Sequence, residues 1–456
     1  MIDKRRITTE TRVGNIGIGG NNPIRIQSMA TTDTNDTPAS VAQAKRIIDA
    51  GGELVRFTTQ GTREAENMQH ISAQLKADGY NQPLVADVHF TAHTADIAAL
   101  YCEKVRINPG NYVDPGRTFK HLEYTDAEYA DELQKIEKKL LPFIQICKEH
   151  HTAVRIGVNH GSLSDRIMSR YGDTPEGIVE SCMEFLRIFK REQFNDVVIS
   201  IKASNTVVMV TTVRLLVATM DKEDMHYPLH LGVTEAGEGE DGRIKSAVGI
   251  GALLTEGIGD TIRVSLSEEP ECEIPVARKL MDLIPECYRL RQEAEASIKD
   301  DTITLTVDAP DMETLQLKAA MAVGALLIDR KATKLVLLTS HLLPLTSLSD
   351  AILQAARIKF TKTEYISCPG CGRTLYNLQE TIARIKAATK DLVGLKIGIM
   401  GCIVNGPGEM ADADYGYVGA GRGKISLYKQ KVCVEKNIPE EEAVEKLLEL
   451  IRSDRK

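Results

Sequence analysis

The sequence predicts an α/β protein with an N-terminal (β/α)8 barrel of the TIM type, a short intervening α/β segment and a C-terminal α+β domain that holds a [4Fe-4S] cluster. Three observations lead to this prediction. Eight short β-branched runs lie between residues 24 and 270, most of them end in polar residues, and two segments rich in cysteine and glycine follow near the C-terminus. We place the domains at residues 1–285, 286–357 and 358–456.

The eight predicted strands alternate with segments of helical period over most of this region. Eight such units in about 250 residues match the usual size of a closed barrel. An open doubly wound sheet is the alternative, which eight consecutive units disfavour. The predicted strands are Ile24–Met29, Leu54–Thr59, Pro83–Phe90, Lys104–Asn108, Ala153–Asn159, Val197–Asn205, Pro228–Glu235 and Thr261–Ser267.

Polar side chains recur at alternate positions toward the ends of these strands, so each set shares one face. Barrel enzymes build their active sites at this end. A single arginine here is more often part of a surface ion pair, and His89 alone could be a core histidine. Five recurring cations instead predict one cavity for a phosphate or diphosphate, whose oxygens suit arginine. The predicted substrate-binding residues are Arg56, Asp87, His89, Arg106, Asn108, Arg155, Asn159, Lys202, Ser204, Thr234, Arg263 and Ser265, with Glu235 as the catalytic acid.

The two cysteine segments offer three thiolates, Cys368, Cys371 and Cys402, and the carboxylate of Glu409. Three soft ligands and one weaker oxygen ligand suit an iron–sulfur cluster with one exchangeable iron, which gives Glu409 a catalytic role as well. A structural zinc site that uses Cys433 is the alternative. The alternation around Cys433 instead predicts a buried core cysteine.

Composition narrows the class of protein. The net charge of -8 argues against a non-specific nucleic-acid binder. We expect no signal peptide and no membrane span, because the longest apolar run, residues 207–220, contains Thr211, Thr212 and Arg214. Nine cysteines, an odd number, indicate reduced thiols and a cytoplasmic enzyme.

The stretch 237–242 fits G-x-G-x-x-G, the pattern of dinucleotide-binding loops. Its three acidic residues would repel a pyrophosphate, so we interpret it as a flexible acidic loop over the barrel mouth.

Several motifs resemble the 4-hydroxy-3-methylbut-2-en-1-yl diphosphate synthase family of the methylerythritol phosphate route to isoprenoids. The resemblance implies a barrel with a [4Fe-4S] domain, in a homodimer where one subunit's cluster domain covers the other's barrel. It also implies a reaction in which two electrons from reduced ferredoxin or flavodoxin open 2-C-methyl-D-erythritol 2,4-cyclodiphosphate with loss of water. The motifs are IQSM at 26–29, ADVHF at 86–90, VRINPGN at 105–111, GVNHGSL at 157–163, HLGVTEAG at 230–237 and both cysteine segments.

The stretch between Ser267 and Cys368 departs from the family. It is longer than the brief connection of the short bacterial members and shorter than the extra domain of the long, plant-like members. We interpret residues 286–357 as a spacer or a reduced version of that domain. Two other functions stay open from the residues alone: a cluster-dependent hydro-lyase, which needs no external electrons, and a non-enzymatic iron–sulfur sensor of an anionic metabolite.

Overall fold

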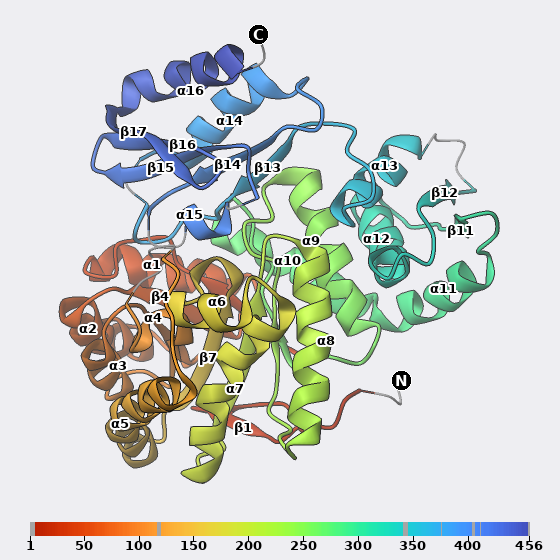
Figure 1. Ribbon diagram of the computed structural model, residues 1–456. Helices are drawn as coiled ribbons and strands as arrows, with labels where there is room; N and C mark the ends of the chain where they lie inside the picture. The colour runs from red at the N-terminus through yellow and green to blue at the C-terminus, as the bar shows by residue number, and fades with distance from the viewer. Residues whose placement is uncertain are drawn as a thin grey trace.

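The computed structural model describes residues 5–115, 120–340, 345–374, 376–403, 406–410 and 412–454. It confirms the predicted barrel (Figure 1). Eight parallel strands follow one another in the order β8-β7-β6-β5-β4-β3-β10-β9, and a parallel bridge between Ile199 and Leu229 joins the two ends. The strands are β3 (Arg25–Met29), β4 (Leu54–Thr59), β5 (Leu84–Val88), β6 (Lys104–Ile107), β7 (Ala153–Asn159), β8 (Val197–Lys202), β9 (His230–Leu231) and β10 (Thr261–Ile262).

The last two barrel strands are much shorter than predicted, because the backbone leaves the ladder near the site. Glu235 adopts a left-handed conformation with φ of 48°, which a non-glycine residue rarely takes and a strand cannot contain. At Gly232 an added Cβ would lie 2.8 Å from Nζ of Lys202, so the chain comes very close to the barrel interior here.

An unpredicted hairpin closes the opposite end of the barrel. Strands β1 (Thr11–Val13) and β2 (Ile16–Ile18) pair antiparallel, and Val13 and Ile18 are fully buried. They pack on small apolar side chains at the starts of four barrel strands, Leu54, Val85, Ala153 and Val198. The hairpin therefore covers the amino-terminal ends of these strands.

Helices surround the barrel, and two of them correct the sequence interpretation. The apolar run at residues 207–220, which we considered only as a possible membrane span, forms a helix of the barrel, α8 (Thr206–Lys222). The supposed acidic loop begins a helix, α9 (Gly239–Leu254). No helix in the described ranges is long and apolar enough to cross a membrane. The others are α1 (Thr37–Asp49), α2 (Thr62–Ala77), α3 (Ala92–Ala99), α4 (Pro109–Tyr112), α5 (Asp126–His150), α6 (Asp165–Tyr171), α7 (Pro175–Arg191) and α10 (Glu273–Asp282), with 3-10 turns at His160–Ser162 and Pro270–Cys272.

The middle segment packs on the side of the barrel (Figure 1). It contains α11 (Ile284–Ala296), β11 (Thr302–Thr306), α12 (Met312–Ile328), β12 (Lys334–Leu338) and α13 (Thr346–Ala355), and β11 pairs parallel with β12. Glycines let α12 approach α9 closely: an added Cβ on Gly251 would lie 2.5 Å from Met321, and one on Gly324 would lie 2.8 Å from the backbone oxygen of Val248. The segment thus shares the apolar core of the barrel.

The C-terminal part is a small α+β domain, as predicted, and lies over the carboxyl ends of the barrel strands (Figure 1). Its sheet has the order β13-β14-β15-β16-β17, parallel over the first three strands and antiparallel over the rest. The elements are β13 (Glu364–Ser367), α14 (Leu378–Thr389), β14 (Lys396–Met400), α15 (Gly406–Glu409), β15 (Tyr415–Gly421), β16 (Lys424–Lys429), β17 (Val432–Pro439) and α16 (Glu440–Asp454).

Cys433 is not the buried core cysteine that we predicted. It is half-buried on the edge strand β17, and its neighbours Val432 and Val434 are 65% and 46% exposed. The alternation was correct, but most residues of β17 are exposed or half-buried because it is the edge strand of its sheet.

Candidate active site

The C-terminal domain covers the mouth of its own barrel. Ala236, just past β9, forms a parallel bridge with Ser367 at the end of β13, and the hydroxyl of Ser267 donates to the backbone oxygen of Cys368 at 2.9 Å. Backbones touch at Gly161 and Gly408, where an added Cβ on Gly408 would lie 1.7 Å from the Gly161 oxygen. This arrangement differs from the one implied by the resemblance, in which the partner's domain covers the barrel.

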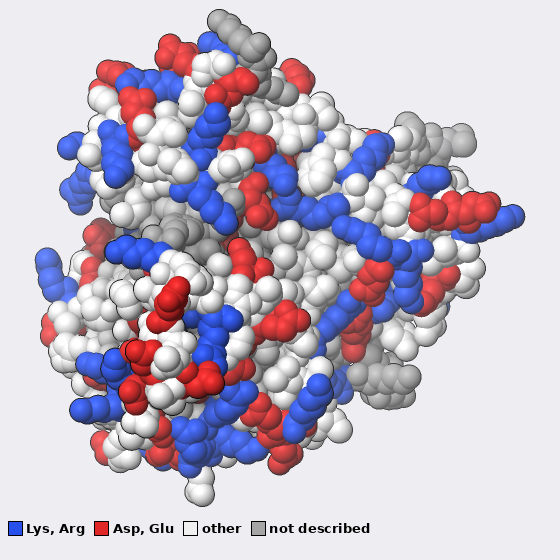
Figure 2. All heavy atoms as spheres, in the orientation of Figure 1, with Lys and Arg blue, Asp and Glu red and all other residues white. Residues whose placement is uncertain are grey.

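Acids of the G-x-G-x-x-G stretch help to hold the two domains together. Glu238 pairs with Lys386 of α14 at 2.9 Å, and Asp241 pairs with Lys362. Figure 2 shows that positive and negative side chains are interspersed along the seam between the domains on this face. The charges that argued against nucleotide binding therefore serve the domain interface.

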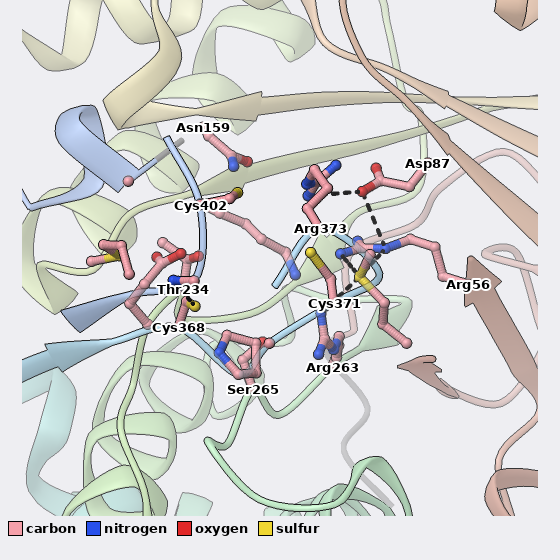
Figure 3. A pocket seen from close by; sticks show the side chains of 18 of the residues that line it. Arg56, Asp87, Asn159, Thr234, Arg263, Ser265, Cys368, Cys371, Arg373 and Cys402 are labelled. Atoms are coloured by element: carbon pink, nitrogen blue, oxygen red, sulfur yellow. Dashed lines mark hydrogen bonds and ion pairs between the residues drawn. The ribbon is translucent and has the colours of Figure 1, made fainter. Parts of the chain in front are cut away.

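One cavity lies between the barrel mouth and the C-terminal domain, and we name it the interdomain cavity (Figure 3). Its walls come from both domains, so the cations and the thiols that were predicted from separate motifs meet in one place. From the predicted set, its lining includes Arg56, Asp87, Arg106, Arg155, Asn159, Lys202, Thr234, Glu235, Arg263, Ser265, Cys368, Cys371 and Cys402.

Four other predicted residues are outside this lining: His89, Asn108, Ser204 and Glu409. His89 accepts a hydrogen bond from Arg106 at 2.9 Å, and burial lowers its pKa to about 3, so it is neutral. Asn108 caps α4 and donates to Ser162. Ser204 donates to the backbone oxygen of Glu409 at 3.2 Å.

Two of the barrel arginines have buried carboxylate partners. Arg106 donates to Asp87 at 3.0 Å. Burial alone would raise the pKa of Asp87, but Arg56 and Arg106 outweigh it and hold the pKa well below its usual value. Arg263 forms a two-point pair with Glu273 of α10, at 3.1 and 3.0 Å. These pairs fix the guanidinium groups and cancel much of their charge.

The remaining cations are poorly compensated. Within the described residues, neither Arg155 nor Lys202 has a carboxylate within 4.0 Å, and burial together with the neighbouring arginines holds the pKa of each well below its usual value. Arg56 contacts the sulfur of Met29 at 2.7 Å and lies 3.9 Å from Asp87, and burial lowers its pKa to about 10. The cavity therefore has an excess of buried positive charge, which favours an anionic ligand.

Two carboxyl groups meet at the edge of the interdomain cavity. A side-chain hydrogen bond joins Glu409 of the C-terminal domain to Glu235 of the barrel. Burial raises the pKa of both groups, and the charge of Glu235 raises that of Glu409 further, to well above its usual value. Burial and mutual repulsion thus favour the protonated form of this carboxyl pair.

The three thiols open onto the cavity from two loops. Cys368 accepts a hydrogen bond from the backbone amide of Gly401 at 3.2 Å, and burial raises its thiol pKa to about 12 when no metal is bound. Within the described ranges, no three His, Cys, Asp or Glu side chains are close enough together to hold a single metal ion. Cys433 lies three strands from β14, about 14 Å at the usual strand spacing, so it cannot complete a zinc site with Cys402.

Sequence reasoning missed three residues that shape the cavity. Met29 and Arg373 line it, and Glu273 orients Arg263 from behind. Met29 and Arg373 each stand in a motif that we had noted, and the alternation of the first strand places Met29 on the polar face. Glu273 has no such signal, because it belongs to a helix that follows the last strand.

Comparisons with known proteins agree with this architecture. A family model described as "GcpE TIM-barrel domain" matches residues 8–278, and one described as "GcpE protein C-terminal domain" matches residues 364–453. Proteins named 4-hydroxy-3-methylbut-2-en-1-yl diphosphate synthase (flavodoxin) are similar over almost the whole chain. That of Bacteroides fragilis is 53% identical, covering 99% of this chain and 96% of its own, and that of Leptospira interrogans is 36% identical, covering 99% and 97%.

The alignment with the Bacteroides fragilis protein extends over 601 positions, more than the 456 residues of this chain. That relative therefore contains residues that have no counterpart here. Neither family model covers residues 279–363, where the middle segment lies. The resemblance drawn from the motifs is confirmed: the chain belongs to the 4-hydroxy-3-methylbut-2-en-1-yl diphosphate synthase family, also called GcpE.

Proposed function

We propose that this chain opens the ring of 2-C-methyl-D-erythritol 2,4-cyclodiphosphate by reduction, releases water and forms 4-hydroxy-3-methylbut-2-enyl diphosphate for isoprenoid biosynthesis. Its relatives are named as synthases of this product. The observation that supports the proposal most strongly is that one cavity has excess positive charge on the barrel side and three thiols on the other side. A diphosphate and a redox cluster would meet there.

The barrel side would hold the diphosphate. Arg56, Arg155 and Lys202 are buried, largely uncompensated donors, so phosphate oxygens would remove an existing electrostatic penalty as well as form hydrogen bonds. Arg106 and Arg263, held by their carboxylates, would orient the ligand. The polar side chains of the lining, Asn159, Thr234 and Ser265, can hydrogen bond to the hydroxyl groups of the substrate.

A [4Fe-4S] cluster would be held by Cys368, Cys371 and Cys402, with Glu409 as a weaker fourth ligand. When bound, such a cluster supplies the two electrons one at a time and a Lewis-acidic iron. The contact of Gly161 with Gly408 brings the second cysteine loop close to the barrel, and the contact of Gly401 with Thr374 brings the two cysteine loops close to each other. Arg373 interacts electrostatically with the thiols of Cys371 and Cys402.

Glu235 is our candidate for protonating the oxygen that leaves as water. Burial raises its pKa, which favours the protonated form that an acid needs, and it lies on the cavity lining. The strained left-handed backbone at this residue is typical of active sites, where surrounding structure enforces an unfavourable conformation. Closure of the cavity by the C-terminal domain would keep bulk water from the reacting groups.

The electron donor would be reduced flavodoxin or ferredoxin; the relatives carry flavodoxin in their names. The nine free cysteines fit a reducing cytoplasm. We also propose a homodimer, although each chain would already complete its own cavity. Sedimentation equilibrium tests this last proposal separately.

The test of the function is an electron-dependence assay. Anaerobically reconstituted protein is incubated with the cyclic diphosphate, with and without reduced flavodoxin, and the product is followed by phosphorus NMR. We expect product only with the reductant, and none with Cys402→Ser. Turnover without the reductant would indicate a hydro-lyase, and tight binding without any turnover would indicate a sensor.

A further inference from the structure

Arg373 is a buried arginine of the C-terminal domain. It lies in the loop after β13, two residues beyond Cys371, and its side chain is 8% exposed. The preceding glycine fixes this loop on the barrel, because an added Cβ on Gly372 would lie 2.7 Å from the backbone oxygen of Thr32. Figure 3 shows Arg373 beside Asp87 in the interdomain cavity, so a side chain of the C-terminal domain reaches the charged groups of the barrel.

The contacts of Arg373 use only part of its guanidinium group. Nη2 lies 4.0 Å from Oδ2 of Asp87, and a side-chain hydrogen bond joins the group to Cys402. Its Nε and Nη1 atoms are buried and have no hydrogen-bond partner in the protein. Arg166, which is equally buried, shows the usual arrangement: it donates to both oxygens of Glu184 and to Asp114. Buried donors without acceptors are costly, and they indicate a missing ligand or solvent.

The surrounding charges specify the kind of ligand. Asp87 already accepts a hydrogen bond from Arg106 and lies near Arg56, so it cannot neutralise Arg373 as well. Arg373 disfavours the positive charge of both Arg56 and Arg106. A group with several acceptor oxygens and negative charge would accept hydrogen bonds from the unpartnered Nε and Nη1 atoms and offset the repulsion, and phosphate fits the planar donor fork of arginine.

We propose that Arg373 is a substrate-binding residue, which grips a phosphate group from the side of the C-terminal domain, opposite the barrel cations. The inference rests on the proposed function and extends it. Diphosphate binding then depends on both domains, and the substrate itself links the C-terminal domain to the barrel. An arginine that only supported the cysteine loop would leave diphosphate affinity unchanged.

Calorimetry with inorganic diphosphate tests the proposal on reconstituted holoprotein. The variants are Arg373→Gln, Arg373→Lys and, as a matched control, Arg384→Gln, which changes an exposed arginine of the same domain. We expect Arg373→Gln to weaken binding roughly 10- to 100-fold, the scale of one or two charge-assisted hydrogen bonds, and Arg373→Lys to weaken it less. Arg384→Gln should bind like the unmodified protein.

Iron content and thermal unfolding of each variant separate the proposal from a structural role. Unchanged diphosphate affinity in Arg373→Gln, with or without loss of iron, would overturn the inference. If Arg373→Gln does not fold, the lysine variant decides: affinity equal to that of the unmodified protein overturns the proposal, and weakened binding with normal iron content supports it. Failure of the unmodified protein to bind either inorganic diphosphate or the cyclic substrate would instead contradict the proposed function.

Discussion

Replacing Arg56 by methionine tests whether the buried positive charge in the cavity lowers the free energy of unfolding. The guanidinium is buried, and burial lowers its pKa from 12.5 to about 10. A lowered pKa means that the charged form is disfavoured in the folded protein at every pH below about 10. At about 1.4 kcal/mol per pKa unit, the penalty is about 3 kcal/mol at neutral pH. Arg56→Met should therefore raise the free energy of unfolding by about 2 to 3 kcal/mol while it weakens diphosphate binding.

Arg263→Met is the matched counterpart with the opposite expected sign. Its partner Glu273 is 1% exposed and would keep only Ser28 and the backbone amide of Leu266 as donors. Leaving a buried carboxylate without its cation costs about 3–5 kcal/mol, so this variant should be less stable. It too should bind diphosphate more weakly.

Urea unfolding and calorimetry with inorganic diphosphate measure both effects on the ligand-free protein. We expect Arg56→Met to raise the free energy of unfolding and Arg263→Met to lower it, while both variants bind diphosphate more weakly. If Arg56→Met were destabilised as much as Arg263→Met, the charge of Arg56 would not be a penalty in the folded state, and the account of the cavity as an unfilled anion site would be refuted.

Other predictions concern the cluster, the ligand and the domain arrangement. Cys402→Ser should lose iron after anaerobic reconstitution, and Cys433→Ser should retain it; the reverse result would reassign the ligands. Diphosphate should raise the lowered pKa of Lys202, so the affinity should fall as the pH rises above the pKa of this lysine in the ligand-free protein. Calorimetry over a series of pH values would reveal the fall, and an affinity that stays constant up to the ordinary pKa of lysine would contradict it. A mixture of Arg56→Met and Cys402→Ser chains should turn over no faster than the Arg56→Met chains alone if each chain completes its own cavity, and faster turnover in the mixture would show that partner chains exchange domains.

The barrel and most of its site were predictable because strand alternation is a local property. Arg106 and Arg155 occupy adjacent positions in the β6–β7 register, and the sequence places both near strand ends. The irregular end of β9 was not predictable, since the left-handed Glu235 is held by contacts with a distant domain.

The residues that were missed depend on the tertiary arrangement. Nothing near Glu273 in the sequence indicates that Arg263 will be its partner, and nothing near Arg373 places it beside Asp87. The same limit affected Cys433, where the correct strand pattern could not tell a covered strand from an edge strand.

The most direct test of the account is a Mössbauer spectrum of protein reconstituted with iron-57, recorded with and without the cyclic diphosphate. If cations and thiols face one another across one cavity, one iron of four should differ from the others and should change when the substrate is added. Arg56→Met should need more substrate for the same change. Four equivalent irons that do not respond to saturating substrate would contradict the shared cavity.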